Sequence, residues 1–291
     1  MVKTYGQLYL DTRRALSEKE DAQYAGMLAR QLLCHLSQKS HEQFLMERDL
    51  YASEQLCAKV AEATDRLLAD EPVAYVIGEW EFYGLSLYVN KNVLIPRDDT
   101  CAVAELAIEK ARDLKSDPRI LDLCTGSGCI GLAIASRVKD ARVTLADLSK
   151  DALAVAKRNV VRHNLTGRVS CIQANALEKP SAFLGKFDII VSNPPYITGQ
   201  EMQQLPCSVS QYEPHMALYG GEDGLDFYRA IAKNFAAALK PGGFLCFEFG
   251  MGQGDDVCHI LEENQYTILE RTRDYNEIER AVIARLDRKE E

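Results

Sequence analysis

The first quarter of the sequence has a helical pattern. Apolar residues recur there every three or four positions, which is typical of helices that bury one face. Thr4-x-x-Gln7 and Ser40-x-x-Gln43 are candidate capping boxes at helix starts. We predict a small helical bundle over residues 1–71. The apolar positions that form the pattern include Ala25, Leu28, Leu32 and Leu36, and then Leu56, Val60, Ala63 and Leu67.

From residue 99 to residue 291, short β-branched runs alternate with helical patterns. This alternation predicts a doubly wound α/β domain, in which helices cover both faces of a parallel sheet. We expect helices at 151–163 and 226–239, and a turn at 241–243 that starts the fifth strand. The predicted strands are 120–124, 142–146, 169–173, 187–192, 244–249, 266–271 and 280–285.

Residues 72–98 connect the two predicted domains. From Tyr75 to Val89, apolar and polar residues alternate with glycines between the runs. This pattern predicts one or two short strands or a hairpin, beginning near Tyr75. Arg97 is expected either to pair with Asp98 or Asp99, or to line a ligand cleft.

Composition narrows the class of protein. With 34 Lys and Arg against 43 Asp and Glu, the net charge of −9 gives no long-range attraction to nucleic acid. No apolar run is long enough to span a membrane, and the N-terminus lacks a signal peptide's apolar core. Nine scattered cysteines without a C-x-x-C pair indicate reduced thiols in a cytoplasmic enzyme. No cysteine or histidine spacing suits a metal, so none is expected.

The strand predicted at 187–192 ends in Asn193-Pro194-Pro195-Tyr196. Prolines cannot donate to a sheet, so the strand stops at the edge where open α/β sheets bind ligands. The amide oxygen of the Asn193 side chain and the backbone carbonyl oxygen of Pro194 can accept both hydrogens of a planar –NH2 group. Tyr196 can lie on the flat face of that group. These residues, Asn193 to Tyr196, form an amide clamp, which would point the nitrogen lone pair at an electrophile. The plain alternative is a Pro-rich turn that Asn193 caps.

A second candidate site follows the first predicted strand. The loop Cys124-Thr125-Gly126-Ser127-Gly128, with Gly131, matches G-x-G-x-x-G and leads into a helix. Glycines there let a ligand approach backbone N–H groups at the helix N-terminus. Asp147 ends the next strand, where a carboxylate can bind ribose hydroxyls, and Asp122 is expected to fix the loop backbone. This pattern indicates an adenosine-containing cofactor, either a nicotinamide dinucleotide or S-adenosylmethionine.

The two candidate sites are expected to share one crevice, because their strands are neighbours at the switch point of a doubly wound sheet. Hydride transfer has no use for an amide clamp, whereas methyl transfer needs the donor methyl in line with a nitrogen lone pair. We therefore favour S-adenosylmethionine. Two alternatives stay open. One is a DNA adenine or cytosine amino-methyltransferase acting on a flipped base, and the other is a non-catalytic interaction module that keeps only the cofactor fold.

Several further motifs accompany the clamp and the glycine loop. They are Ile95-Pro96-Arg97, Glu213-Pro214 with Ala217-Leu218, Gly220-Gly221 with Asp223-Gly224-Leu225, and Glu248 with Gly250 and Gln253. Together and in this order, the motifs resemble the peptide chain release factor N(5)-glutamine methyltransferases (the HemK/PrmC group). The match runs from about Pro72 to the end of the sequence, and the helical N-terminal domain also suits this family.

The resemblance implies a Rossmann-like, seven-stranded class I methyltransferase sheet and an N-terminal bundle that docks the substrate. It implies methylation of the glutamine amide in the Gly-Gly-Gln tip of class 1 release factors, with S-adenosylhomocysteine as product. Asn193 and Pro194 would hold the amide, with Pro195 and Tyr196 beside it. The cofactor-binding residues would be Cys124, Thr125, Gly126, Ser127 and Gly128 for methionine and ribose, Asp147 for the ribose hydroxyls, Ala176 for adenine, and Asn193.

The sequence departs from the family pattern at three places. Cys124 stands where the family has glycine, and Asp98-Asp99-Thr100-Cys101 replaces Pro-Glu-Thr-Glu. Asn175-Ala176 replaces an acidic–aromatic pair, which removes stacking on adenine. None of these changes falls on the clamp. We expect a cytoplasmic monomer that acts on release factors and binds neither a membrane nor nucleic acid directly.

Overall fold

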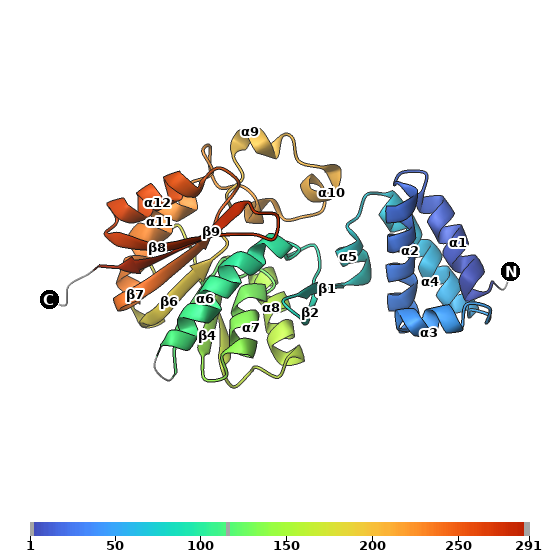
Figure 1. Cartoon of the computed structure of the whole chain (residues 1–291), viewed down its shortest axis with the longest axis horizontal. Helices are drawn as coiled ribbons and strands as arrows, with labels where there is room; N and C mark the ends of the chain where they lie inside the picture. The colour runs from blue at the N-terminus through green and yellow to red at the C-terminus, as the bar shows by residue number, and fades with distance from the viewer. Residues whose placement is uncertain (1–2, 115–116, 288–291) are drawn as a thin grey trace. The chain divides into compact units, whose positions relative to one another are not determined.

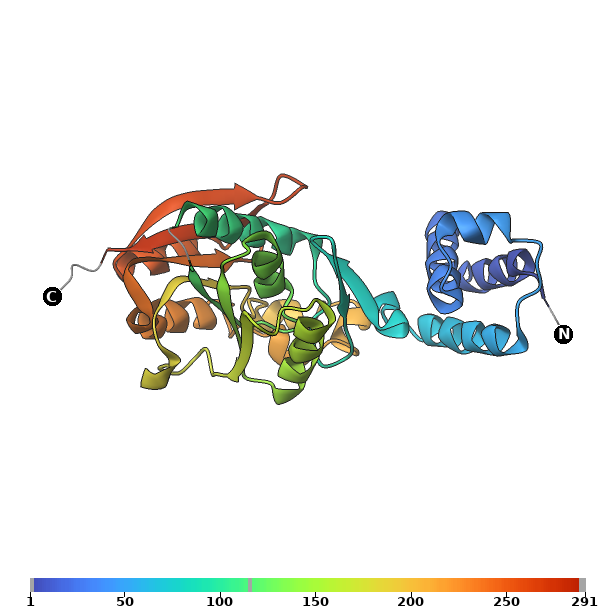
Figure 2. The same cartoon turned by 90° about the horizontal axis from the view of Figure 1, so that it is seen from below.

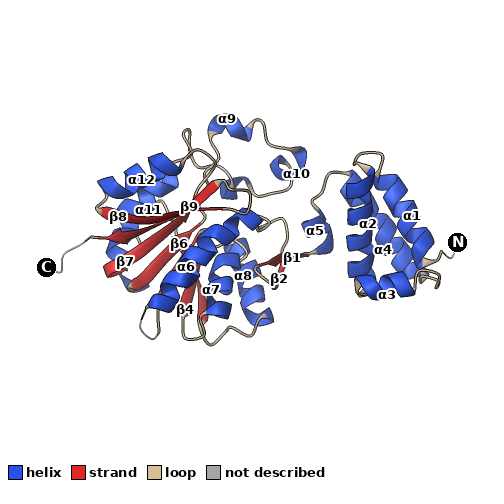
Figure 3. Ribbon diagram, in the orientation of Figure 1, coloured by secondary structure: helices blue, strands red, loops and turns tan. Residues whose placement is uncertain are grey.

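The computed structural model describes residues 3–114 and 117–287, and the protein folds as two compact units. The first comprises Met1–Glu79 with Pro206–Tyr212, and the second comprises Trp80–Leu205 with Glu213–Glu291. Figure 3 shows that the seven-stranded sheet belongs to the second unit. The docking and linker roles predicted for residues 1–71 and 72–98 remain predictions. No helix in the described ranges is long and apolar enough to cross a membrane.

The first unit is the predicted helical bundle, with its first four helices in blue in Figure 1. Both expected capping boxes are present, one made by Thr4 with Gln7 and one by Ser40 with Gln43. The apolar faces close on a core that includes Leu8, Leu33, Phe44, Leu56 and Val60. The helices are α1 (Tyr5–Leu16), α2 (Ala22–Ser37), α3 (His41–Met46), α4 (Glu54–Leu68), α5 (Val73–Ile77) and the later α10 (Cys207–Ser210).

The segment that begins at Tyr75 is helical, so the strand predicted there is wrong. Helix α5 starts just after Pro72, whose carbonyl accepts the N–H groups of Tyr75 and Val76. Tyr75 and Val76 are buried. Burial in the bundle therefore overrides the strand preference of these residues. The predicted hairpin begins only after Gly78, as β1 (Glu79–Phe82) and β2 (Leu85–Tyr88).

The second unit is built on the seven-stranded sheet, in the order β5-β4-β3-β6-β7-β9-β8. Strand β9 is antiparallel to β7 and β8, and the other neighbouring pairs are parallel. All seven predicted strands are confirmed, and with them the α/β class. The strands are β3 (Arg119–Leu123), β4 (Arg142–Asp147), β5 (Val169–Gln173), β6 (Phe187–Ser192), β7 (Leu239–Glu248), β8 (Tyr266–Arg273) and β9 (Glu279–Leu286).

Strand β7 starts earlier than the sequence suggests. It begins at Leu239, so the predicted turn at residues 241–243 lies inside the strand and not before it. The pairing register between β6 and β7 shifts between Phe187 and Ile189. Such a shift is typical of a β-bulge or a similar irregularity, and it occurs at this turn. The helix predicted over 226–239 ends at Asn234 and continues only as a 3-10 turn, because Leu239 already pairs with Phe187.

Helices cover both faces of the sheet, and Figures 1 and 2 show them from two directions. On one face, α6, α7 and α8 pack on a core that includes Ile120, Leu145 and Val191. On the other face, α11 and α12 pack on a core that includes Phe187 and Phe247. The helices and turns of this unit are η1 (Asp98–Thr100), α6 (Cys101–Asp113), α7 (Cys129–Arg137), α8 (Lys150–Arg162), η2 (Ala182–Leu184), α9 (Gly199–Met202), η3 (His215–Ala217), α11 (Asp226–Asn234), η4 (Phe235–Ala238) and α12 (Gly254–Glu263).

Candidate active site

The two candidate loops start from neighbouring strands, as predicted. Strands β3 and β6 are parallel, and Leu123 pairs with Ser192 at their carboxyl ends. The hydroxyl of Ser192 donates to the carbonyl oxygen of Leu123 at 2.6 Å, which ties these ends together. On one side of β3 the order continues to β4, and on the other side to β6, so the loops meet at the switch point of the sheet.

A cavity of about 640 Å³ opens at this edge. Both loops contribute to its wall, as does the end of β4. Of the residues predicted for the site, those that line the cavity are Cys124, Gly126, Asp147, Ala176, Asn193 and Pro195. Thr125, Ser127, Gly128, Pro194 and Tyr196 belong to the same loops without being among the lining residues.

Asp122 fixes the glycine loop, as the sequence predicts. Its carboxylate is fully buried and accepts the hydroxyl of Thr125 at 2.5 Å and the N–H of Gly131 at 2.9 Å. Burial raises the pKa of Asp122 to about 7, although these two hydrogen bonds act in the opposite direction. The loop is therefore held from beneath by a group that does not itself face the cavity.

Gly131 is required by the contact between helix α7 and strand β4. A methyl group on Gly131 would lie 2.2 Å from Leu145 Cδ2, which leaves no room for any larger residue. Gly126 differs, because its φ is +53° and nothing lies within 4 Å of the position of a methyl group there. The middle of the loop is thus open, while its last glycine packs the helix onto the sheet.

Cys124 places a side chain in the wall of the cavity. Its φ of +60° is the left-handed conformation that glycine adopts most easily, which agrees with the glycine of the family pattern. Burial raises the pKa of its thiol, so Cys124 presents a neutral group to whatever fills the cavity.

Asp147 joins the end of β4 to the glycine loop. It accepts the N–H groups of Gly126 and Ser149, each at 2.9 Å. Burial raises its pKa, and these two bonds work against that rise. A carboxylate has about four lone-pair directions, so Asp147 can still accept hydroxyl groups from a ligand in the cavity.

Three glycines enclose Pro195 and Tyr196, two against the backbone and one against the Tyr196 ring. Methyl groups on them would lie 2.6 Å from Pro195 O for Gly220, 2.3 Å from Tyr196 O for Gly224, and 3.0 Å from Tyr196 Cδ2 for Gly250. These positions explain two of the motifs in the sequence, since only glycine lets those loops close around the clamp.

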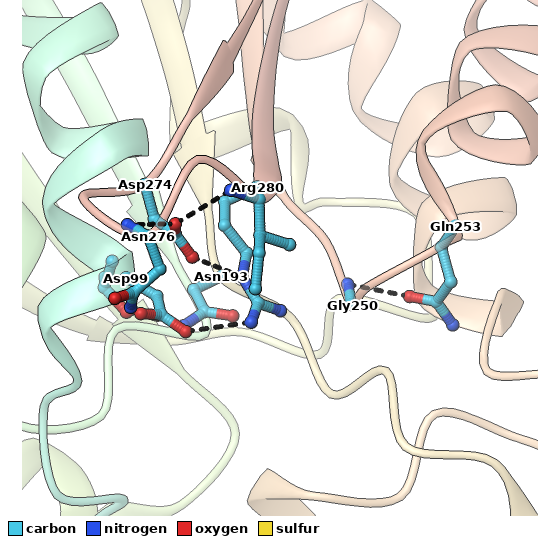
Figure 4. Close-up of polar contacts among 9 residues, drawn as sticks. Asp99, Asn193, Gly250, Gln253, Asp274, Asn276 and Arg280 are labelled. Atoms are coloured by element: carbon cyan, nitrogen blue, oxygen red, sulfur yellow. Dashed lines mark hydrogen bonds and ion pairs between the residues drawn. The ribbon is translucent and has the colours of Figure 1, made fainter.

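Gln253 completes this enclosure, and Figure 4 shows it beside Gly250. Its Oε1 accepts the N–H of Gly250 at 2.9 Å, and its Nε2 donates to the carbonyl oxygen of Tyr196 at 3.1 Å. The loop after β7 is therefore fastened to the clamp. Burial raises the pKa of the Tyr196 phenol, which favours its neutral form.

One of the two roles predicted for Arg97, an ion pair with Asp98 or Asp99, is wrong, because Arg97 pairs with Glu213. Glu213 is buried, accepts the N–H of Ile95 at 3.2 Å and forms an ion pair with the Arg97 guanidinium. The sequence singled out both motifs without linking them. The link matters because Leu94 and Pro214, each next to this contact in the sequence, line the cavity.

Sequence reasoning gave no role in the site to three polar residues near the clamp, Thr100, Glu248 and Gln253. It proposed Thr100 only as one of three candidate N-caps, and the Thr100 side chain makes no capping hydrogen bond to α6. Thr100 and Glu248 are each 2% exposed. The sequence did contain a signal for Glu248, which is a charged residue at the end of an apolar strand. Burying a glutamate there is costly, so such a residue indicates a specific role. Within residues 3–114 and 117–287, no group of three or more His, Cys, Asp or Glu could hold a metal ion.

Two family models match the chain. Residues 7–78 match the family described as the PrmC N-terminal domain, and residues 104–207 match the methyltransferase small domain. The catalytic domain of hMettl16 in complex with the MAT2A 3'UTR hairpin 6 has a TM-score of 0.56, is 15% identical and covers 82% of this chain and 85% of that one. This likeness shows a shared fold alone.

Curated relatives are closer in sequence. The protein is 38% identical to a bifunctional methyltransferase of Rickettsia typhi over 82% of its length, but spans only 49% of that protein. It is 44% identical over 213 residues to the release factor glutamine methyltransferase of Clostridium acetobutylicum, covering 73% of this chain and 74% of that protein. The chain therefore belongs to the release factor glutamine methyltransferase family.

Proposed function

We propose that this protein transfers a methyl group from S-adenosylmethionine to the side-chain amide nitrogen of the glutamine in the Gly-Gly-Gln motif of class 1 peptide chain release factors. The observation that carries the proposal is one cavity whose wall contains Asn193 and Pro195 of the clamp together with Gly126 and Asp147. Family membership supports the same reaction.

The residues around the cavity fit S-adenosylmethionine. Gly126 has open space where other residues carry a side chain, so a ligand can approach the loop backbone. Asp147 can accept ribose hydroxyls, and Ala176 leaves room for a flat base. When bound, S-adenosylmethionine supplies a methyl group made electrophilic by its sulfonium. Cys124 to Gly128 would hold its methionine and ribose portions.

The clamp then prepares the nucleophile. An amide nitrogen is a poor nucleophile, because its lone pair is delocalised into the carbonyl group. Asn193 Oδ1 and the backbone oxygen of Pro194 would accept its two hydrogens and let the nitrogen become pyramidal, with the Tyr196 ring against the amide face. With the amide held in this way, its nitrogen would be directed at the methyl carbon that S-adenosylmethionine supplies. The carbon–sulfur electron pair would leave with sulfur, and one N–H proton would pass to water. Positioning and fixed dipoles provide the catalysis.

The first unit would dock the release factor. Its exposed apolar residues include Leu45, Met46, Leu50 and Tyr51, and such clusters mark protein interaction sites. We further propose a cytoplasmic monomer whose partner is a protein and not nucleic acid, consistent with a net charge of −9.

A methyl-transfer assay tests the proposal. Labelled S-adenosylmethionine is offered with a class 1 release factor, with its Gly-Gly-Gln→Gly-Gly-Ala variant, or with duplex DNA. We expect label only in the unmodified factor. Asn193→Ala should lower kcat by about 100- to 1,000-fold, as for the loss of one preorganised polar group, while the calorimetric Kd for S-adenosylmethionine stays within a few-fold.

Asn264→Ala is the matched control, since this asparagine only caps helix α12 by donating to Ile260 O at 2.8 Å. It should leave kcat unchanged. Label in DNA would favour the nucleic-acid alternative, and failure to bind S-adenosylmethionine would favour the interaction module. If Asn193→Ala weakened cofactor binding as much as transfer, Asn193 would be a structural residue.

A further inference from the structure

The clamp works only if the Asn193 amide faces the right way. Its oxygen and nitrogen ends are nearly equal in size, and a half-turn about the last side-chain bond exchanges them. With Oδ1 toward the cavity, Asn193 accepts a substrate N–H. With Nδ2 there, it would oppose the substrate –NH2 with another donor. Something in the protein must therefore distinguish the two ends, and this requirement rests on the proposed function.

The carboxyl ends of β6 and β7 place a second polar residue beside Asn193. Ser192 pairs with Phe247 in the parallel register, so the next residues, Asn193 and Glu248, follow at the same edge of the sheet. Glu248 is 2% exposed, and its Oε2 has no hydrogen-bond partner in the described part of the protein. A buried carboxyl with an unused acceptor is costly unless it serves a purpose.

Thr100 connects these two residues. Asn193 Nδ2 donates to Thr100 Oγ1 at 3.3 Å, and Thr100 is 2% exposed. A hydroxyl that accepts from Asn193 still has its own hydrogen to donate. Hydrogen bonds from Thr100 and from Asn193 lower the pKa of Glu248, against burial, which raises it to about 8. The nitrogen end of Asn193 therefore meets the Thr100 oxygen, and the Glu248 carboxyl stands at the neighbouring strand end.

Charged residues around Glu248 influence its pKa. Arg280 forms ion pairs with Asp99 at 3.1 Å and with Asp274 at 3.0 Å, and Figure 4 shows these contacts. Arg280 lowers the pKa of Glu248, and Asp99 raises it. Asp274 also accepts the N–H groups of Asn276 and Ile278, which fixes the β8–β9 turn. Whether Glu248 is charged or protonated, it keeps oxygen lone pairs that a –NH2 group can use.

We propose that Thr100 and Glu248 are positioning residues, which hold the Asn193 amide with Nδ2 toward the sheet and Oδ1 toward the cavity. Because the Thr100 hydroxyl gives its hydrogen to Glu248, turning the amide over would place Oδ1 against a lone pair of Thr100 Oγ1 and not against a donor. The buried pair thus selects the orientation that can accept a substrate N–H, without touching the substrate.

The first test replaces the Thr100 hydroxyl with a methyl group of the same shape. Thr100→Val should lower kcat for the release factor at least ten-fold, with KM and the calorimetric Kd for S-adenosylmethionine within three-fold. Thr100→Ser restores the hydroxyl and should return kcat to within three-fold of the wild type. Thr144→Val, which makes the same change on β4 away from the site, should have no effect.

Glu248 is tested in the same way. Glu248→Met removes its acceptors at similar size and should lower kcat at least ten-fold, whereas Glu248→Gln keeps one acceptor oxygen and should stay within three-fold. Thr100→Val should cost nothing further in an Asn193→Ala background, because its effect passes through Asn193. An equal loss in both backgrounds, or an unchanged kcat in Thr100→Val, would overturn the proposal.

A measurement without substrate separates this inference from the proposed function. The –NH2 signal of the Asn193 side chain in ¹⁵N NMR, assigned by its loss in Asn193→Ala, should exchange with solvent at least ten-fold faster in Thr100→Val. Protected hydrogens in a protein that does not methylate release factors would refute the proposed function and leave the positioning role standing. Methyl transfer with equally fast exchange in wild type and Thr100→Val would refute the positioning role alone.

Discussion

Two fully buried acids distinguish this site at the scale of single residues. Asp122 lies beneath the glycine loop, and Glu248 lies beneath the clamp. Burial raises the pKa of Asp122 to about 7 and that of Glu248 to about 8. Neither lines the cavity. Asp122 instead accepts hydrogen bonds from Thr125 and Gly131, and we propose a comparable supporting role for Glu248 below Asn193. In each case the protein carries the cost of desolvating a carboxyl.

The raised pKa of Asp122 predicts how stability changes with pH. In the unfolded protein Asp122 titrates near pH 4, whereas the folded protein holds the proton up to about pH 7. The folded state therefore binds more protons between these values, and the free energy of unfolding falls as the pH rises through this window. Asp122→Asn removes this contribution, so its stability relative to the wild type should increase from pH 5 to pH 8.

Denaturant unfolding at several pH values measures this difference. The slope per pH unit should approach, but not exceed, about 1.4 kcal/mol. Asp140→Asn alters an exposed carboxylate and should leave the wild-type slope unchanged. A constant difference between wild type and Asp122→Asn across the range would mean that Asp122 is already ionised in the folded protein at pH 5.

At the scale of elements, segments far apart in sequence form one wall of the cavity. Glu213 accepts from Ile95 N–H and pairs with Arg97, although more than a hundred residues separate them. Its side chain is 1% exposed, whereas that of Arg97 is 39% exposed. Most of the stabilisation from this contact therefore comes from the buried carboxylate of Glu213, because water partly screens the charge of the Arg97 guanidinium.

Glu213→Ala should loosen this wall. The Ile95 N–H and the Arg97 guanidinium lose their acceptor, which costs on the order of 2 kcal/mol of folding free energy. We expect the Kd for S-adenosylmethionine to rise roughly ten-fold, equivalent to about 1.4 kcal/mol, when measured by calorimetry. Asp113→Ala removes the exposed ion pair with Lys110 and should change neither quantity. Loss of stability with unchanged affinity would confine Glu213 to a structural role.

At the scale of the whole molecule, the two units are expected to divide docking and chemistry. The most exposed apolar residues of the first unit lie around the end of α3, where Met46 is 78% exposed and Tyr51 is 72% exposed. The cavity and the clamp belong entirely to the second unit. Changes to the docking surface should therefore alter substrate affinity and leave the chemical step intact.

The double variant Met46→Glu with Tyr51→Glu tests this division. Charges at the centre of an apolar interface are costly, so KM for intact release factor should rise at least ten-fold. The kcat at saturation and the Kd for S-adenosylmethionine should stay within three-fold. Val161→Glu places a charge on an exposed apolar position of the second unit and serves as control. An unchanged KM would locate docking elsewhere.

Local patterns were enough to predict most of the fold. The seven strands, the helical bundle and both capping boxes follow from periodicity and from side chains that bond to their own backbone. The errors occur where a distant partner decides. Tyr75 and Val76 are helical because the bundle buries them, and β7 starts at Leu239 because Phe187 pairs with it.

For the site, the sequence by itself determined where the candidate groups stand: the clamp at Asn193, the glycine loop and the carboxylate of Asp147 all lie at strand ends that the pattern identifies. Only the tertiary structure decided which side chains support them. Arg97 could not be assigned to Glu213, nor Asn193 to Thr100, because these contacts depend on which loops the strand order brings to one edge. The periodicity of a segment shows which of its faces packs on the core. It does not show which polar side chain of another segment will lie beside it, because that depends on how the whole chain folds.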